Sequence, residues 1–179
     1  MRTKILTGIA IAIAGLLSYQ ILFSRTDPQG WFKFSSPEGR FEILMPAEPV
    51  TGRVIDLPLP KFTARLHPYW ALRPPSFGVM CGYADFPSPP ENSSVVFDWT
   101  RDGSITSVRG KLIAEENRPL GGYPGRRFRS TAQGESFIDE EMHLVGQRLY
   151  LITVYSKTES PDKNINKVFD SFRFTPASQ

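Results

Sequence analysis

The sequence predicts an α+β fold, in which an antiparallel β-sheet has helices packed against it and is preceded by one N-terminal transmembrane helix. Strand-like runs at 137–145 and 148–156 are separated only by two residues, Gly146 and Gln147, which is the spacing of a tight hairpin. The second run has large or β-branched side chains on both faces, which suits a strand covered from two sides. A helix beginning near Ser160 can cover this sheet with one apolar stripe, formed by Ile165, Val168, Phe169 and Phe172.

The N-terminal segment 5–23 has nineteen residues and no charge. As a helix it would be about 28 Å long, close to the hydrocarbon thickness of a bilayer. Arg2 and Lys4 precede it, which favours an N-terminus left in the cytoplasm. We therefore expect a membrane anchor at residues 1–26 and a single domain at residues 27–179. The domain would be exported to the periplasmic or extracellular side of the cytoplasmic membrane.

A cleaved signal peptide is the alternative, because Ala12-Ile13-Ala14 offers the small residues of a cleavage site. The apolar run continues to Phe23, which favours the uncleaved anchor. Cys81 is the single cysteine, so an intrachain disulfide and a lipid on a cysteine after the run are both excluded.

The charge of the chain is unevenly distributed. The formal net charge is +3, but Arg2, Lys4 and Arg25 lie in the first 26 residues, where no acid occurs. Without these three, 18 basic residues stand beside 18 acidic ones. A neutral domain lacks the basic footprint of a nucleic-acid-binding protein, so we expect no nucleic-acid partner.

The first half of the domain is rich in proline and predicts short, broken or edge strands. Twelve of the 16 prolines lie between Pro28 and Pro90. A first hairpin is predicted at 31–34 and 41–45, around the turn at 35–39. Further strands are expected at 53–57, 62–72 and 77–84.

A helix is predicted over 92–108, because Asn92 or Ser93 can cap it and Val95, Val96 and Trp99 begin an apolar face. Gly103 is its weak point. Strands are then expected at 111–116 and 125–131, joined through a turn with Pro124-Gly125 as its central pair.

Four local patterns occur in order along the domain. They are Trp31-Phe32-Lys33-Phe34 with Glu38-Gly39-Arg40-Phe41-Glu42-Ile43-Leu44-Met45-Pro46, then Gly122-Tyr123-Pro124-Gly125-Arg126, Arg148-Leu149-Tyr150, and Val168-Phe169-Asp170-Ser171-Phe172. Together they resemble small exported bacterial proteins with a PsbP-like fold, over about residues 31–174. The resemblance implies an antiparallel sheet covered by helices, an accessory or binding role, and no shared catalytic motif. PsbP itself is a soluble extrinsic subunit, so the expected anchor departs from it.

Asp139, Glu141 and His143 alternate along one predicted strand, so their side chains should project from one face. Two carboxylates and an imidazole could bind a divalent metal, or could place an acid near a histidine. The alternative interpretation is a solvated polar face, which is favoured because alternating polar residues in an antiparallel sheet usually face solvent.

Arg126, Arg127 and Arg129 form the second candidate site, for an anionic ligand or an acidic partner surface. Arg127 and Arg129 should share a face, with Phe128 pointing the other way. An ordinary charged face, balanced by Glu135, Asp139 or Glu140, is the favoured alternative. His67 could line an aromatic pocket, but a loop or core-edge position is preferred.

The sequence contains no Gly-x-Ser-x-Gly elbow and no phosphate-binding loop. We therefore expect a non-catalytic, membrane-anchored accessory or protein-binding domain without a cofactor, whose partner could be another envelope protein. A metal- or small-molecule-binding module is the alternative. A hydrolase of unrecognised type is the third hypothesis and would need a cleft with perturbed titratable groups.

Overall fold

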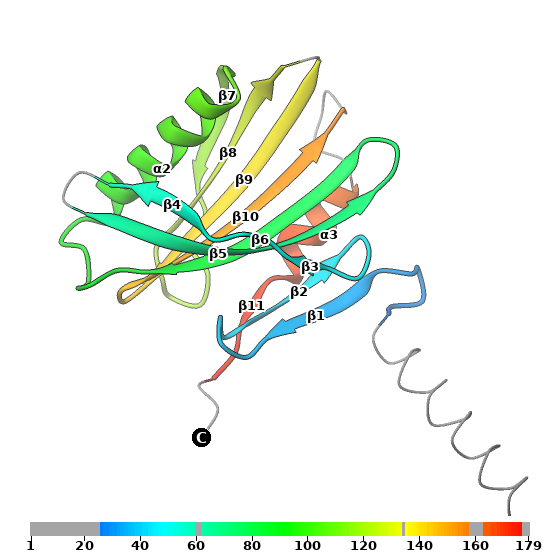
Figure 1. Ribbon diagram of the computed structural model, residues 1–179, viewed down its shortest axis with the longest axis horizontal. Coiled ribbons are helices and arrows are strands. Elements are labelled where there is room, and N and C mark those ends of the chain that lie inside the picture. The colour runs from blue at the N-terminus through cyan, green and yellow to red at the C-terminus, as the bar shows by residue number, and fades with distance from the viewer. Residues whose placement is uncertain (1–25, 60–61, 134, 158–162, 177–179) are drawn as a thin grey trace, which may run out of the picture.

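The computed structural model describes residues 26–59, 62–133, 135–157 and 163–176. They form two antiparallel sheets with two helices packed against them, which confirms the α+β prediction (Figure 1). The predicted transmembrane helix at 5–23 and the helix start at Ser160 lie outside these residues. Within the described ranges, no helix has both the length and the apolar character needed to cross a membrane.

The larger sheet has the strand order β3-β5-β6-β10-β9-β8-β7, and β4 pairs with β5 beside β3. Its strands are β3 (Val50–Thr51), β4 (Ile55–Pro58), β5 (Thr63–Arg73), β6 (Phe77–Asp85), β7 (Leu112–Asn117), β8 (Gly125–Ala132), β9 (Ser136–Val145) and β10 (Arg148–Ser156). The hairpin of β9 and β10 is in the predicted register, with Val145 opposite Arg148, and Gly146 adopts a positive φ of 60° in its turn.

The smaller sheet consists of β1 (Phe32–Ser36), β2 (Phe41–Met45) and β11 (Arg173–Phe174), in the order β1-β2-β11. With α3 (Lys163–Ser171) it covers one face of the larger sheet, while α2 (Ser93–Ser107) lies on the other face (Figure 1). The stripe predicted for α3 is confirmed, because Ile165, Val168, Phe169 and Phe172 are all buried. The sheet therefore separates two apolar cores.

The strand β10 belongs to both cores. Leu149 and Leu151 pack with the α2 side, whereas Tyr150, Ile152 and Val154 pack with the α3 side. Side chains of a strand alternate between its faces, so apolar residues at successive positions require cover on both sides. This confirms the prediction of a strand covered from two sides.

The described chain begins with a polar tie to α3. Asp27 Oδ1 accepts hydrogen bonds from the backbone N–H groups of Gln29 and Trp31, both over 2.8 Å. Its other oxygen, Oδ2, lies 2.5 Å from Lys167 Nζ. Trp31 is buried in the core beside this pair.

Two expectations for the loops and strands are corrected. The turn before β8 is centred on Gly121-Gly122 rather than Pro124-Gly125, because both glycines have positive φ and Leu120 bonds in both directions with Tyr123. The proline-containing strand β5 is also long and lies inside the sheet. Pro68 is tolerated there because it falls between the segments paired with β4 and β3, where the neighbouring ladder is interrupted.

Candidate functional site

A cavity of about 640 Å³ lies between α2 and the larger sheet, and we call it the α2 cavity. The sequence of α2 explains it. Asn92 caps the helix, and the first half of the helix buries Val96 and Phe97. The second half presents a face of small residues at helical spacing, Thr100, Gly103, Ser104 and Ser107. Small side chains cannot fill the space above the sheet, so the helix leaves a hollow there.

The lining of the α2 cavity is mostly apolar. The sheet contributes Leu66, Trp70, Leu72, Met80, Ile138, Leu151 and Tyr155, and β4 with its following loop contributes Ile55, Leu57, Pro58 and Leu59. Trp70 and Trp99 are 40% and 47% exposed, so large apolar side chains reach solvent at the rim. This size and lining are typical of pockets that bind small molecules.

One buried carboxyl group lies in this mostly apolar lining. Glu140 of β9 is only 1% exposed. Its Oε2 accepts a hydrogen bond from Ser104 Oγ of α2, with an O···O distance of 2.8 Å, and another from Thr153 Oγ1 of β10, at 2.9 Å. Burial raises the pKa of Glu140 to about 7, although the two hydroxyl donors act in the opposite direction. At neutral pH this carboxyl group is therefore divided between its charged and uncharged forms.

The second oxygen of this carboxyl group, Glu140 Oε1, is buried and has no hydrogen-bond partner in the described part of the chain. A buried acceptor without a partner typically destabilises a fold by about 1 to 3 kcal/mol, and by more when it is charged. Such a group within an otherwise apolar pocket is a common mark of a functional site.

The α2 cavity meets one condition of the hydrolase hypothesis, since it holds a titratable group with a raised pKa. The described lining residues include no histidine, lysine or cysteine, and the hydroxyls of Ser104 and Thr153 both donate to Glu140. The hydrolase hypothesis stays a prediction.

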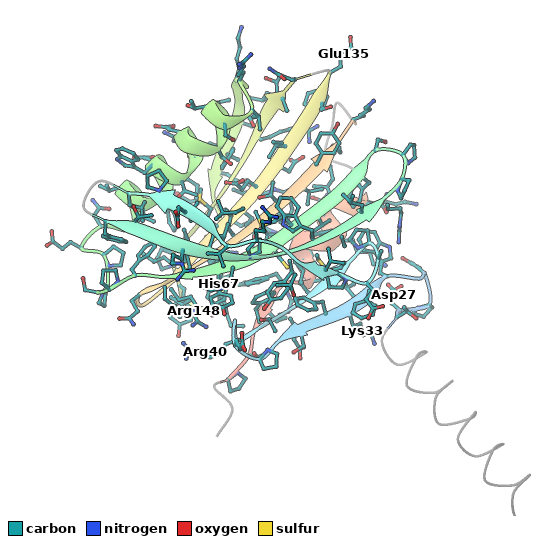
Figure 2. The ribbon with its side chains drawn as sticks, viewed as in Figure 1. Asp27, Lys33, Arg40, His67, Glu135 and Arg148 are labelled. Carbon is teal, nitrogen blue, oxygen red and sulfur yellow. The ribbon has the colours of Figure 1, made fainter. Side chains whose placement is uncertain are left out.

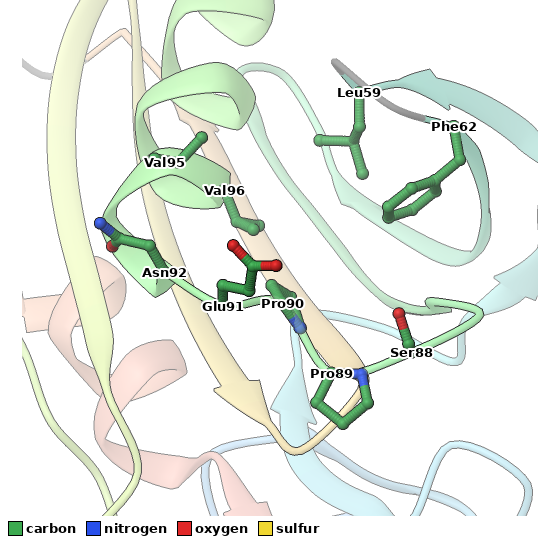
Figure 3. A pocket seen from close by; sticks show the side chains of 9 residues that line it. All are labelled: Leu59, Phe62, Ser88, Pro89, Pro90, Glu91, Asn92, Val95 and Val96. Carbon is green, nitrogen blue, oxygen red and sulfur yellow. The ribbon is translucent and has the colours of Figure 1, made fainter.

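A smaller hollow of about 310 Å³ adjoins the first turn of α2 (Figure 3). It lies between Leu59 and Phe62 on one side and the loop Ser88–Glu91 on the other, with Val95 and Val96 from the helix. Its polar Asn92 is already used, because the side-chain oxygen accepts from the Ser94 N–H. This hollow therefore extends the apolar surface near Leu59, which it shares with the α2 cavity, without adding a second buried polar group.

Asp139, Glu141 and His143 lie on the opposite face of β9, as their alternation predicted. The favoured interpretation of a solvated face is wrong, because they are 1%, 3% and 0% exposed. The smaller sheet and α3 cover this face, and the His143 ring stacks on Phe172 with centroids 5.7 Å apart. Within the described ranges, no group of three or more His, Cys, Asp or Glu side chains is arranged to hold a metal ion.

All three side chains of this set are paired: His143 and Glu141 with each other, and Asp139 with Arg129. His143 Nε2 lies 2.8 Å from Glu141 Oε1, and Asp139 Oδ2 lies 2.6 Å from Arg129 Nη1. Gly125 stands opposite His143 on β8, and a Cβ there would overlap the imidazole ring and the carbonyl oxygen of Arg118. The close approach of this strand leaves room for the histidine because residue 125 has no side chain.

The three arginines do not form one surface. Arg126 points to the α2 side, where it contacts Asp98 and Glu115. Arg127 lies on the α3 side over the ring of Phe169, 4.3 Å from its centroid. Arg129 is buried in its pair with Asp139.

Arg127 and Arg129 thus share a face, as predicted, with Phe128 on the other. The structure confirms Asp139 as a partner but not the other two acids expected to balance these charges. Glu140 bonds to hydroxyl groups, and Glu135 lies at the outer tip of the β8–β9 hairpin (Figure 2). Anion or partner binding by this set stays a prediction.

His67 lies on β5 and is exposed, which agrees with a position at the core edge. The His67 ring stacks on the Tyr83 ring, with centroids 5.1 Å apart. The Arg148 guanidinium lies 4.5 Å from the centroid of the Tyr83 ring, and Figure 2 shows Arg148 near His67. Arg148 also binds both oxygens of Asp85 and the carbonyl oxygen of Glu38. This cluster joins the turn of the smaller sheet to the larger sheet.

Comparison with known proteins identifies the fold. No protein-family model matches the chain, and no curated protein matches it by sequence. Among solved structures, it is similar to the solution structure of cyanobacterial PsbP (CyanoP) from Synechocystis sp. PCC 6803. The TM-score is 0.57 at 13% identity, over 80% of this chain and 92% of that one. The fold is PsbP-like. The resemblance inferred from the sequence is therefore confirmed at the level of architecture.

Sequence reasoning missed the buried carboxyl group in the cavity lining of this PsbP-like domain. Glu140 was considered only as a charge that could balance the arginines. A signal was present, because every second residue from Ile138 to Leu144 is apolar except Glu140. An acid in the middle of an apolar strand face should be buried, and a buried acid needs an explanation.

Proposed function

We propose that this PsbP-like domain is a non-catalytic binding module that takes a small molecule with an apolar body into the α2 cavity. The observation that carries the proposal is the cavity itself, which has a volume of about 640 Å³ and a mostly apolar lining that includes the partly exposed Trp70 and Trp99. Its volume falls within the usual range of ligand sites.

The proposed setting is the outer side of a cytoplasmic membrane. Residues 5–23 support it by their length and lack of charge, and the preceding Arg2 and Lys4 favour export of the domain. Two reporters fused after Gln179 test the setting. A phosphatase active only after export should be active, and a fluorescent protein that matures only in the cytoplasm should be dark. The reverse pattern contradicts the exported location.

Binding can be tested on the full chain with a photoreactive alkyl diazirine and mass-spectrometric mapping of the labelled residues. Label is expected on cavity residues such as Met80, Trp99 and Leu151, and an unlabelled alkyl alcohol should compete for them. Gly103→Leu should reduce this labelling, because residue 103 lines the cavity and a Cβ there has open space around it.

The matched control is Gly103→Ala, which adds little volume at the same position and should keep the labelling. Label spread over the surface, unaffected by competitor or by Gly103→Leu, would count against ligand binding. Labelling of residues 5–23 by lipid-dissolved probe is mapped separately and does not enter this comparison.

Binding to another envelope protein is the second candidate function. Exposed apolar side chains of the cavity lining favour it, since Leu72 is 68% exposed and Trp70 and Trp99 are also partly exposed. Affinity capture from membranes, comparing the native chain with Leu72→Ser, tests it. A specific protein that is captured by the native chain and lost with Leu72→Ser would support this role, whereas identical recovery with both chains would contradict it.

A further inference from the structure

The carboxyl group of Glu140 gives the α2 cavity a chemical preference that its shape alone does not provide. Glu140 comes from the middle of β9, and its side chain reaches between Thr153 of β10 and Ser104 of α2. Both hydroxyls donate to Oε2. The other oxygen, Oε1, is left for a donor that the described protein does not supply.

The described residues of the cavity lining include no cation that could donate to Oε1. α2 presents Thr100, Gly103, Ser104 and Ser107, and β10 presents Leu151, Thr153 and Tyr155. The only other acid of the lining is Asp56 on β4, which is exposed. The Tyr155 hydroxyl lies 2.7 Å from Ser136 Oγ, so it already has a partner.

Two basic residues near α2 are engaged elsewhere. Arg101 contacts Asp98, Asp102 and Glu115, and Arg126 contacts Asp98 and Glu115. None of these charges is among the residues that line the α2 cavity. The cavity therefore combines apolar walls with acidic groups and no counterion among its described residues.

We propose that the ligand of the α2 cavity is an amphiphile with a protonated amine, whose ammonium group binds Glu140 Oε1 while its apolar body lies against Met80, Trp99 and Leu151. This inference rests on the proposed function. A neutral alcohol could donate one hydrogen bond to the same oxygen, but it would not compensate a buried negative charge. An alkyl carboxylate would be repelled. The raised pKa of Glu140 agrees with a carboxyl group that lacks its countercharge.

The test uses three ligands with the same alkyl chain, decylamine, decanol and decanoate, as competitors of the photoreactive probe on the full chain at neutral pH. Decylamine should displace the probe from the cavity residues at a concentration about tenfold or more below that of decanol, as expected for a charge-assisted hydrogen bond. Decanoate should be the weakest. The series on the native chain decides the matter even if a variant fails to fold.

The matched variant is Glu140→Gln, which keeps the shape of the side chain and removes its charge. Decylamine and decanol should then compete within about twofold of each other. Equal competition by amine and alcohol on the native chain overturns this inference and leaves the proposed function standing. An amine preference that survives in Glu140→Gln also overturns it. No probe labelling in the cavity of the native chain removes both proposals.

Discussion

Ser104 Oγ donates a hydrogen bond to Glu140 Oε2 over 2.8 Å and thereby joins α2 to the middle of β9. This contact crosses the layer in which the helix and the sheet otherwise leave a cavity. It fixes the carboxyl group with one oxygen hydrogen-bonded and the other buried without a partner among the described residues. Glu140 should therefore affect both the stability of the domain and the proposed binding of a ligand.

The protonation of Glu140 should make stability depend on pH. Folding raises its pKa to about 7, so between roughly pH 4.5 and 7 the folded chain binds more protons at this site than the unfolded chain. This contribution lowers stability as the pH rises through that range, and the loss is complete above the folded pKa. Its size is on the order of 3 kcal/mol.

Replacing the acid with Glu140→Gln should remove this contribution. Urea unfolding at about pH 5 and about pH 8 measures it, because the stability of the variant relative to the native chain should rise by on the order of 3 kcal/mol between the two. A difference that is the same at both pH values would show that Glu140 does not titrate in this way.

The buried pair of Arg129 and Asp139 should be sensitive to the loss of one partner. Arg129→Met should lower the free energy of unfolding by about 3 to 5 kcal/mol, because it removes the guanidinium that pairs with the buried carboxylate of Asp139. Adding Asp139→Leu should recover most of that loss. Chemical denaturation of the single and double variants gives the coupling, and an unrecovered double variant would contradict the explanation.

A surface pair provides the control for that experiment. Asp170 is paired with Arg118 over 3.2 Å, and its side chain is 62% exposed. Asp170→Ala should therefore change stability by no more than about 1 kcal/mol.

Two glycines should respond in opposite directions to the same added methyl group. Gly103→Ala should stabilise the fold by about 1 kcal/mol, because residue 103 lies inside α2 and a Cβ there meets no atom within 4 Å. Gly125→Ala should destabilise it by about 1 to 3 kcal/mol, because the methyl group would overlap His143 and the Arg118 carbonyl. Thermal unfolding of both variants checks the signs, and a stabilising Gly125→Ala would refute the close approach.

The single cysteine should be unreactive towards thiol reagents in the folded protein. Cys81 is fully buried in the core on the α3 side, and burial raises the pKa of its thiol well above the usual range. A disulfide reagent should leave the native chain unmodified and label one thiol in denaturant. Rapid labelling under native conditions would mean that this core opens readily.

Periodic patterns in the sequence predicted the helices and strands. They could not predict which of these helices and strands pack against one another. The apolar stripe of α3 and the two covered faces of β10 follow from alternation within one segment. The strand β11 has only two residues, and β3 also has two, so neither has a period to detect. The third strand of the smaller sheet depends on β11 returning to β2, a contact between residues far apart in the chain.

The polar face of β9 shows why the candidate site was harder to predict than the fold. Alternation placed Asp139, Glu141 and His143 together correctly, but it could not show that Phe172 and α3 cover them. The α2 cavity arises from a mismatch between small residues on the helix and apolar residues on strands distant in sequence. Glu140 became informative only when both sides of that mismatch were known.

The salt bridge between Asp27 and Lys167 also decides how the domain would be presented on a membrane. It holds the beginning of the domain at α3 and the smaller sheet, across the larger sheet from α2 (Figure 1). A tether that precedes Thr26 would therefore leave from the side opposite the α2 cavity. The rim formed by Trp70 and Trp99 would face the aqueous compartment, so that a ligand would arrive from solution and not by lateral diffusion out of the bilayer.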